Sequence, residues 1–431
     1  MTALSTSYPG PEKPLEQWLA WLETVHPVNI DMGLDRVSSV ADRLQLRPSC
    51  MPLILVAGTN GKGSTVNMLS AIYAAAGFRV GAYTSPHVSD FCERICINGE
   101  MADEKEVVDA LLFVEQGRQP ETLTYFEYTT LAAMRIFLQK QCDVVVLEVG
   151  LGGRLDATNL WDADCAVVTS IALDHQEYLG SDVGVIATEK AAIGRRGKPL
   201  IIGQANPPDT LLPFAERNGF EVVDIGALPE AELPEPAMNG VHQRRNAGCA
   251  VAAVNSLQST LPVEESSIHM GLQNAVVPAR FEQARVDGVS VIMDVAHNPA
   301  GACALRETWE QEYPNAQCEL IFASLADKDI KGLVVELSPL VASWHCIELE
   351  STRAASVAHL KNVILEHTPS STVLTYDSPD DAWRCARKRG ISQQRPVLVA
   401  GSFYTIGLIR QVWQAMENSG RVSIEATGNE C

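Results

Sequence analysis

Residues 53–64, the sequence L-I-L-V-A-G-T-N-G-K-G-S, constrain the fold more than any other part of the chain. Five apolar residues predict a buried strand that runs straight into a glycine-rich loop. Glycines at 58, 61 and 63 let the backbone turn tightly and point its N–H groups inward, because no Cβ blocks the approach. Lys62 could reach the phosphates of a nucleotide, Ser64 could coordinate Mg²⁺, and the helix starting near Ser64 would direct its positive end at the anion. The pattern predicts a phosphate loop in which Gly63 stands between the lysine and the serine.

The composition indicates a globular protein rather than a membrane or nucleic-acid-binding one. At 431 residues, 46% hydrophobic and 20% charged, the chain has room for two or three domains. No apolar run approaches the roughly 20 residues that cross a bilayer, and the N-terminus lacks a basic region followed by an apolar one. The 11 cysteines form no C-x-x-C pair, which is typical of buried thiols in a reducing compartment. We therefore expect a cytoplasmic monomer without a membrane partner.

The net charge of −20 argues against nucleic acid as a partner, because an acidic surface repels phosphates. Anionic small molecules would need a local basic lining to overcome the same field. The candidates for that lining are Lys62, Arg154, Lys190, Arg244, Arg245 and Arg280.

Apolar, β-branched runs alternate with helical stretches along the chain, which predicts parallel sheets covered by helices. The strand candidates are 53–57, 80–84, 143–149, 165–171, 199–203, 289–295, 319–324 and 396–400. A second α/β series begins after Phe281, at Val289. We therefore expect an α/β fold with a P-loop ATPase-like N-terminal domain over 1–285, built on a mostly parallel sheet, and a smaller Rossmann-like domain over 286–431.

Polar side chains stand at the ends of several predicted strands. Glu148 ends the strand 143–149 and precedes a glycine-rich bend, and Ser85 follows the strand 80–84. Ligands bind at the carboxyl ends of parallel strands, and carboxylate and hydroxyl oxygens suit Mg²⁺. His175 follows the strand 165–171, where it could be a metal ligand, a base or a loop histidine, since hard cations favour oxygen. The second series repeats the arrangement at Asp294, His297 and Ser402, which suggests a cleft between domains.

Lys190 lies late in a predicted helix over 182–193. A lysine on a helix is usually a solvated charge, but burial beside other cations would lower its pKa and favour the neutral amine. A neutral amine could react with CO₂ to give a carbamate, which would turn a cation into a carboxylate suited to Mg²⁺. From the residues alone both roles stay open.

Several motifs, taken in order, resemble the family of bifunctional dihydrofolate synthase/folylpolyglutamate synthases, which belongs with the Mur ligases. They are G-T-N-G-K-G-S, S-P-H, L-T-Y-F-E-Y, E-V-G-L-G-G-R-L-D-A-T-N, A-L-D-H, E-K-A-A-I and D-V-A-H-N-P. The resemblance implies an ATP-dependent ligase that phosphorylates the carboxylate of dihydropteroate or a reduced folate. The amine of L-glutamate then attacks the acyl phosphate. Positioning and charge neutralisation would supply most of the catalysis.

The resemblance also implies roles for individual residues. Nucleotide contacts are expected at Thr59, Asn60, Gly61, Lys62, Gly63, Ser64, Asn246, Arg280 and Asp294. Metal ligands are expected at Ser64, Ser85, Glu148, His175 and a carbamylated Lys190, with Lys62, Lys190 and His175 in catalytic roles and K⁺ left open beside Mg²⁺. The pterin-side pocket is expected at Ile30, Asp31, Met32, Thr124, Tyr125, Phe126, Glu127, Leu155, Asp156 and Ala157, where Phe126 could stack on the ring. His297 and Ser402 are expected on the glutamate side.

The sequence shows two departures from the family and leaves three alternatives. Tyr404 stands where some relatives carry histidine. The family's P-G-R-F reads Pro278-Ala279-Arg280-Phe281 here, which loses a glycine and keeps the arginine. The L-D-A-T-N spelling favours dihydropteroate as a substrate over polyglutamylation alone. A Mur-type enzyme of wall synthesis would need a UDP-sugar domain ahead of the phosphate loop, whereas only residues 1–52 precede the strand here. A P-loop switch or binding module would need no second domain with polar strand ends, and no guanine-reading N-K-x-D is present.

Overall fold

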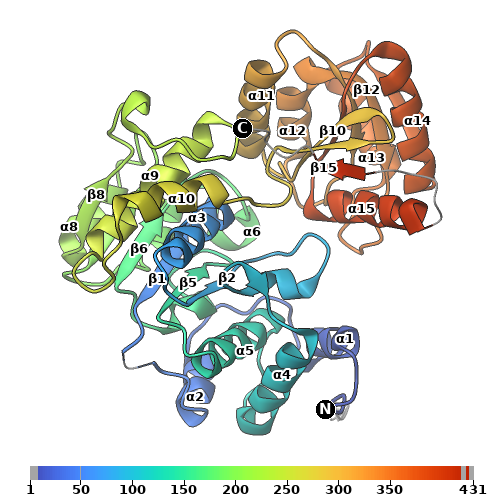
Figure 1. Ribbon diagram of the computed structural model, residues 1–431. Coiled ribbons are helices and arrows are strands. Elements are labelled where there is room, and N and C mark those ends of the chain that lie inside the picture. Colours follow the sequence, from blue (N-terminus) through green and yellow to red (C-terminus); the bar gives the residue numbers. More distant parts are fainter. Residues whose placement is uncertain (1–7, 49, 419–423, 427–431) are drawn as a thin grey trace. The chain divides into compact units, whose positions relative to one another are not determined.

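The computed structural model describes residues 8–48, 50–418 and 424–426, and its contacts divide the chain into two compact units. The first unit comprises Met1–Ala237 and Gln243–Val276, and the second comprises Met238–His242 and Val277–Cys431. Figure 1 shows that each unit is built around a sheet flanked by helices. The sequence predicts one boundary at 285/286, whereas the contacts divide the chain at 276/277 and group residues 238–242 with the second unit.

The first unit contains a mostly parallel sheet in the order β4-β3-β2-β5-β1-β6-β7-β8. Its strands are β1 Leu53–Ala57, β2 Val80–Tyr83, β3 Ile95–Ile97, β4 Glu100–Met101, β5 Val144–Glu148, β6 Cys165–Val168, β7 Pro199–Ile202 and β8 Glu221–Asp224. β1 pairs in parallel with β5 and β6, and β3 runs antiparallel to β2. The central strand β1 is buried along its whole length, which explains its continuous apolar sequence.

Helices cover both faces of this sheet. They are α1 Leu15–Val25, α2 Asp35–Arg43, α3 Lys62–Ala75, α4 Glu104–Arg118, α5 Tyr125–Gln139, α6 Gln176–Leu179, α7 Val183–Ala191, α8 Leu211–Asn218, α9 Val241–Ser256 and α10 Glu265–Asn274. Short 3₁₀ helices are η1 Phe91–Arg94, η2 Ala157–Leu160 and η3 Glu230–Glu232. α3 packs against α10, and α5 packs against α4.

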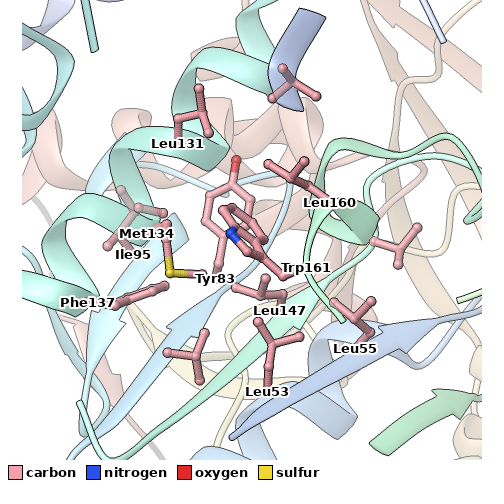
Figure 2. Close-up of a cluster of buried hydrophobic side chains, with 14 of the residues drawn as sticks. Leu53, Leu55, Tyr83, Ile95, Leu131, Met134, Phe137, Leu147, Leu160 and Trp161 are labelled. Carbon is pink, nitrogen blue, oxygen red and sulfur yellow. The ribbon is translucent and has the colours of Figure 1, made fainter. Parts of the chain in front are cut away.

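The core of the first unit joins alternate residues of the sheet to α5. Leu53 and Leu55 of β1 and Leu147 of β5 belong to the same buried cluster as Leu131 and other side chains of α5, part of which is drawn in Figure 2. Trp161 is part of the same cluster, and its indole N–H donates to the carbonyl of Leu46 at 2.7 Å. Each of these large side chains contributes about 1.5–3 kcal/mol through burial. The cluster therefore fixes α5, and with it the residues at its N-terminus, against the sheet.

The second unit holds a sheet in the order β13-β12-β11-β14-β10-β9-β15. Its strands are β9 Glu282–Val286, β10 Val289–Asp294, β11 Cys318–Phe322, β12 Val341–Ile347, β13 Thr372–Tyr376, β14 Val397–Ala400 and β15 Ile424–Ala426. Its helices are α11 Pro299–Glu312, α12 Ile330–Leu337, α13 Val357–His367, α14 Pro379–Gln393, α15 Phe403–Asn418 and the 3₁₀ turn η4 Ser338–Leu340. The five strands β13, β12, β11, β14 and β10 run parallel to one another. β9 runs antiparallel to both of its neighbours, β10 and β15.

The predicted class is confirmed: both units are α/β folds with mostly parallel sheets. In the described residues, no helix combines the length and the apolar character that a membrane span requires.

Candidate active site

The carboxyl ends of four neighbouring strands meet at one edge of the first sheet. The register aligns Val56 of β1 with Glu148 of β5, and Ala57 with Val168 of β6. Tyr83 of β2 aligns with Leu147. The glycine-rich loop after β1, the carboxylate that ends β5 and the segments after β2 and β6 are therefore neighbours. This arrangement is the one that binds ligands in open parallel sheets.

The segment that follows β6 forms hydrogen bonds with the loop after β1. The Oγ1 of Thr169 donates to the carbonyl of Asn60 at 2.7 Å, and the N–H of Asn60 donates to the Oγ of Ser170 at 3.0 Å. Thr59 exchanges hydrogen bonds with Ala172 in the same segment. β6 therefore ends at Val168, earlier than the predicted 171, because its next residues turn to support the loop.

Gly61 occupies a position of the loop where glycine is required. Its φ of +86° is left-handed, and a Cβ there would lie 2.4 Å from the Oδ1 of Asn246 on α9. α3 begins at the next residue, Lys62. The loop thus leads into a helix N-terminus, whose unpaired N–H groups and positive dipole end favour an anion. The structure brings Asn246, a predicted nucleotide contact, to this loop.

A lysine, a carboxylate and two serines gather beside the loop. The Nζ of Lys62 lies 3.2 Å from the carbonyl of Gly58 and 3.9 Å from the Glu148 carboxylate. The N–H of Ser85 donates to Glu148 at 3.1 Å. The Oγ of Ser64 is buried and makes no hydrogen bond within the described part of the chain. A buried hydroxyl without a partner is costly, which suggests that a ligand supplies one.

Lys190 of α7 is buried at the same edge. Its Nζ donates to the carbonyl of Gly58 at 3.0 Å. Burial, together with the nearby charge of Lys62, lowers the pKa of Lys190 to about 7, although nearby carboxylates oppose the shift. The amine is therefore largely neutral just above neutral pH, which is the form that reacts with CO₂ to give a carbamate. The backbone of α7 approaches the glycine-rich segment after β5 closely, since a Cβ on Gly153 would lie 2.6 Å from the carbonyl of Glu189.

His175 follows β6 and immediately precedes α6. It has a left-handed φ of 51°, and its Nε2 lies 4.0 Å from the Asp174 carboxylate. Its side chain is 38% exposed. No group of three or more His, Cys, Asp and Glu side chains in the described residues forms a metal site by itself. A cation here would need serine oxygens in addition to Glu148, so the metal roles stay predictions.

The predicted pterin-side residues come together around the N-terminus of α5. Thr124 and Glu127 form a capping box, in which each side chain accepts a hydrogen bond from the other residue's backbone N–H. Phe126 packs beside Tyr83 with ring centroids 5.8 Å apart. The same ring lies beside the loop after β5, since a Cβ on Gly150 would lie 2.6 Å from it.

Arg36 links two of these predicted residues and was missed from the sequence. Its guanidinium pairs with the Asp31 carboxylate at 2.7 Å and with Glu127 at 3.0 Å. Asp156 is buried and caps η2 through Thr158. Burial raises the pKa of Asp156, and its hydrogen bonds oppose that rise. Part of the predicted pocket therefore organises the backbone, while Phe126 offers a ring. No short sequence pattern signals a pair 91 residues apart such as Arg36 and Glu127.

The remaining predicted pterin-side residues lie near residue 30, at the start of α5 and at the start of η2. The Met32 side chain lies 3.5 Å from the place of a Cβ on Gly152. Ile30 is 40% exposed, Tyr125 opens α5, and Ala157 opens η2 two residues after Leu155.

The second unit groups its own predicted residues at the carboxyl end of β10. The buried Asp294 carboxylate accepts the N–H groups of Phe281 and Ala296, both at 2.9 Å. Burial raises the pKa of Asp294, and the charge of Arg280 opposes that rise. The Arg280 guanidinium lies 5.4 Å from the ring of Phe403.

His297 and Ser402 stand at neighbouring strand ends of this unit. The His297 ring lies 6.1 Å from the Phe403 ring. The Oγ of Ser402 accepts the N–H of Thr405 and thereby caps the start of α15. Ala279, which replaces the family's glycine, is left-handed at φ 59°. Backbone strain of this kind concentrates at functional sites.

Comparisons with known proteins agree with this arrangement. Residues 56–263 match the Mur ligase middle domain, and residues 279–403 match the Mur ligase glutamate ligase domain. The dihydrofolate synthase/folylpolyglutamate synthase of Escherichia coli is 39% identical over 96% of this chain and 99% of its own length. The Haemophilus influenzae protein of the same description is 35% identical over 94% of this chain and 98% of its own length.

Solved structures resemble the whole chain as well. E. coli FolC in complex with DHPP and ADP aligns with a TM-score of 0.85 and 38% identity, over 95% of this chain and 100% of its own. The Yersinia pestis bifunctional folylpolyglutamate synthase/dihydrofolate synthase, complexed with AMPPNP and an Mn ion, aligns with a TM-score of 0.83 and 36% identity. That alignment covers 96% of this chain and 100% of the Yersinia chain.

Proposed function

The chain belongs to the Mur ligase family of bifunctional dihydrofolate synthase/folylpolyglutamate synthases, and we propose that it joins L-glutamate to dihydropteroate and to the glutamate tail of reduced folates. As a member of this family it is an ATP-dependent amide ligase. In the proposed reaction the γ-phosphoryl group of ATP moves to the acceptor's carboxylate and ADP leaves. The amine of glutamate then forms the amide bond and displaces phosphate. Dihydropteroate gives dihydrofolate, and a folate gains one glutamate.

The observation that carries this proposal is the grouping beside the loop of residues 58–61. Lys62, the N-terminus of α3 and the backbone N–H groups of the loop offer positive charge to a triphosphate. In a chain of net charge −20, such a local concentration is what an anionic nucleotide needs. The Yersinia and E. coli relatives bind AMPPNP and ADP, in line with this assignment.

The residues beside the loop also fit a divalent cation. The buried Oγ of Ser64 lacks a partner among the described residues. Glu148 supplies a carboxylate beside the preceding residue, since a Cβ on Gly63 would lie 3.4 Å from it. We assign Ser64, Ser85, Glu148 and His175 as the residues that would hold Mg²⁺, as they match the family's positions. A bound Mg²⁺ would neutralise charge that develops on the transferred phosphoryl group.

We assign Lys190 as a carbamylated residue at the same edge. A neutral amine adds to CO₂ and loses one proton, which yields a carbamate anion. The lowered pKa of Lys190 favours this reaction, and the resulting anion would offset the charge of Lys62. ¹³C-labelled CO₂ should give a carbamate signal by NMR that strengthens as pH rises through about 7 and disappears in Lys190→Ala. Short-chain carboxylic acids should partly restore the activity of that variant. An active crystal with a plain amine at Lys190 would refute the assignment.

The two substrates beyond ATP are assigned to separate parts of the chain. Phe126 offers a ring face to a pterin beside the loops of residues 30–32 and 150–157. Asp294, Arg280, His297 and Ser402 of the second unit are assigned to ATP and glutamate on the family's pattern. These assignments explain why polar strand ends recur in the second sheet.

The product test separates this function from its competitors. The protein is incubated with ATP, Mg²⁺, glutamate and either dihydropteroate or tetrahydrofolate, and the products are identified by mass. We expect one added glutamate with both acceptors; addition only to the folate would make the chain a folylpolyglutamate synthase alone. ATP hydrolysis that is indifferent to glutamate and to both acceptors would refute a ligase.

Lys62→Ala should abolish product formation, whereas Lys198→Ala should not. Lys198 pairs with Asp164 on the surface of the same unit, 3.0 Å away, and serves as the matched control. Near-normal activity of Lys62→Ala would reject its role in phosphate binding.

A further inference from the structure

Arg94 carries a guanidinium that has no acidic partner among the residues described by the structure. Its Nε donates to the Nδ1 of His87 at 2.9 Å. Its charge lies 5.4 Å from the ring of Phe91 and 5.5 Å from the ring of Tyr125. Across residues 8–48, 50–418 and 424–426, no carboxylate forms an ion pair with it and neither Nη atom makes a hydrogen bond. His87 and the two rings thus fix the orientation of a cation whose two outer nitrogens remain available.

The nearest acidic residue in the sequence is fully occupied elsewhere. Glu93 accepts the backbone N–H groups of Val88, Ser89 and Asp90 at 2.7–2.9 Å, within the capping box of η1. Its oxygens already accept hydrogen bonds from three backbone N–H groups, and it forms no ion pair with Arg94 in the described residues. The chain therefore keeps an arginine unneutralised although its acidic residues outnumber its basic ones by 20. Aromatic rings can stabilise such a cation by about 0.5–2 kcal/mol without neutralising it.

Arg94 contacts segments from both the phosphate side and the ring side of the proposed site. Its carbonyl accepts the N–H of Thr84, next to Ser85, whose N–H binds Glu148. On its other side Tyr125 opens α5 and is followed by Phe126, the ring assigned to the pterin. An elongated aromatic acid whose ring end lies at Phe126 would bring its acid end toward Glu148, past Arg94.

We infer that Arg94 binds the carboxylate end of the acyl acceptor, which in the proposed function is the benzoate carboxylate of dihydropteroate. This inference rests on the proposed function. Two free Nη–H groups match the two oxygens of a carboxylate in fork geometry, and such charge-assisted pairs are among the strongest polar contacts in proteins. His87 acts as a positioning residue, because its Nδ1 accepts the Nε–H and leaves both Nη atoms of the guanidinium available.

Binding measurements with a matched ligand pair test the inference without turnover. The ligands are dihydropteroate and its carboxamide, which keeps the rings and loses the charge. The parent enzyme should bind the acid about tenfold to a hundredfold more tightly than the amide, the range expected for a hydrogen-bonded charge pair. Arg94→Met should bind both ligands alike, and Arg94→Lys should keep part of the preference.

Steady-state kinetics supply a second readout. In Arg94→Met the KM for dihydropteroate should rise by about tenfold or more, with the KM for ATP and the thermal midpoint unchanged. Arg135→Met is the control, because Arg135 of α5 also lies over a ring, 4.0 Å from the centroid of Phe113. That variant should behave as the parent does.

The outcomes are distinct for the two claims. A parent enzyme that binds neither ligand would overturn the proposed function itself. A parent that binds and turns over dihydropteroate, with Arg94→Met retaining the full preference for the acid, would overturn only the role of Arg94. An equal loss in Arg135→Met would likewise overturn it, since the effect would then be a general consequence of removing a stacked arginine. If Arg94→Met fails to fold, Arg94→Lys decides, and a preference as large as the parent's would count against the fork.

Discussion

Gly61 is one of the residues on which the geometry of the phosphate loop depends. Its left-handed backbone and the nearby Asn246 amide exclude any side chain. Gly77, at the end of α3, has almost the same φ, +88° against +86°, but nothing lies within 4 Å of the place its Cβ would take. The pair therefore separates the cost of backbone strain from the cost of a clash.

Gly61→Ala should lose ATP-dependent turnover, and Gly77→Ala should keep it. Both substitutions cost about 1–2 kcal/mol of stability, because an L-residue is strained in this conformation. Only the Cβ at residue 61 displaces Asn246 and moves the loop. Thermal unfolding measures the cost of backbone strain, which both variants share. The KM for ATP measures the effect of moving the loop, which only Gly61→Ala should show. Equal kinetics for the two variants would contradict the assigned role of the loop.

His242 gives the fold a defined response to acid. Burial and the charge of Arg280 lower its pKa to about 4, against an ordinary pKa of about 6.5 in the unfolded chain. Between these values the unfolded state binds the extra proton, so stability is present above about pH 6.5 and is lost as the pH falls toward 4. At pH 5 the loss relative to pH 8 should reach about 2 kcal/mol.

Urea unfolding of the parent and of His242→Gln at about pH 8 and about pH 5 measures this contribution. Carboxylates also titrate in this range, so the informative quantity is the difference between the two proteins. The variant should lose less stability on acidification. An equal loss of stability in both proteins would contradict the lowered pKa of His242.

The site residues that the sequence itself singles out are those whose chemistry is set locally. Lys62 and Ser64 follow from the loop spelling, and Glu148 follows from its position at the end of an apolar strand. Arg36 and Arg94 could not be found this way. Arg36 pairs with Glu127, 91 residues along the chain, and only the folded chain brings the two together. For Arg94, the sequence does not show that the folded chain leaves its guanidinium without an acidic partner among the described residues.

Among the elements, Arg36 of α2 ties the loop of residues 26–31 to the N-terminus of α5. It is the cationic partner of the buried Glu127 carboxylate, which also accepts the Thr124 N–H at 2.8 Å. Removing one member of a buried ion pair leaves an uncompensated charge, which costs more than the intact pair contributes. The loop and α5 should therefore respond together to a substitution at Arg36.

Arg36→Met should destabilise the protein by about 3 kcal/mol and raise the KM for dihydropteroate. Adding Glu127→Gln should recover part of that stability, since the stranded charge is then absent. Arg43→Met is the control on the same helix, because Arg43 pairs with Glu121 at the surface and should cost about 1 kcal/mol or less. A loss of stability in Arg36→Met no larger than in Arg43→Met would contradict the proposed connection between the loop of residues 26–31 and α5.

Elements with uniform apolar faces were predicted closely, and those with polar interiors were missed. The candidate 53–57 coincides with β1 Leu53–Ala57, and 143–149 contains β5 Val144–Glu148. β12 Val341–Ile347 was missed because Ser343 and His345 interrupt its apolar run. Both are buried, and the His345 ring pairs with the Glu319 carboxylate of the neighbouring strand β11 at 3.1 Å. No local pattern predicts that a polar residue will find such a partner.

In the whole molecule, two sheets with polar strand ends are assigned to one reaction. The first unit holds the phosphate loop, the assigned metal residues and the ring of Phe126. The second unit carries the glutamate ligase domain match and the group around Asp294. The alternation of strands and helices predicted this architecture, because parallel sheets need helices on both faces. The course of the chain between the units could not be predicted, since residues 238–242 carry no periodic signal.

The acyl-phosphate route can be tested by following an oxygen atom. Dihydropteroate labelled with ¹⁸O in its carboxylate is incubated with the enzyme, ATP, Mg²⁺ and L-glutamate, and the released phosphate is analysed by mass. An acyl phosphate transfers one carboxylate oxygen to phosphate, so each dihydrofolate formed should be matched by one phosphate carrying a single ¹⁸O. Unlabelled phosphate accompanying dihydrofolate, or phosphate release without any amide product, would contradict the proposed mechanism.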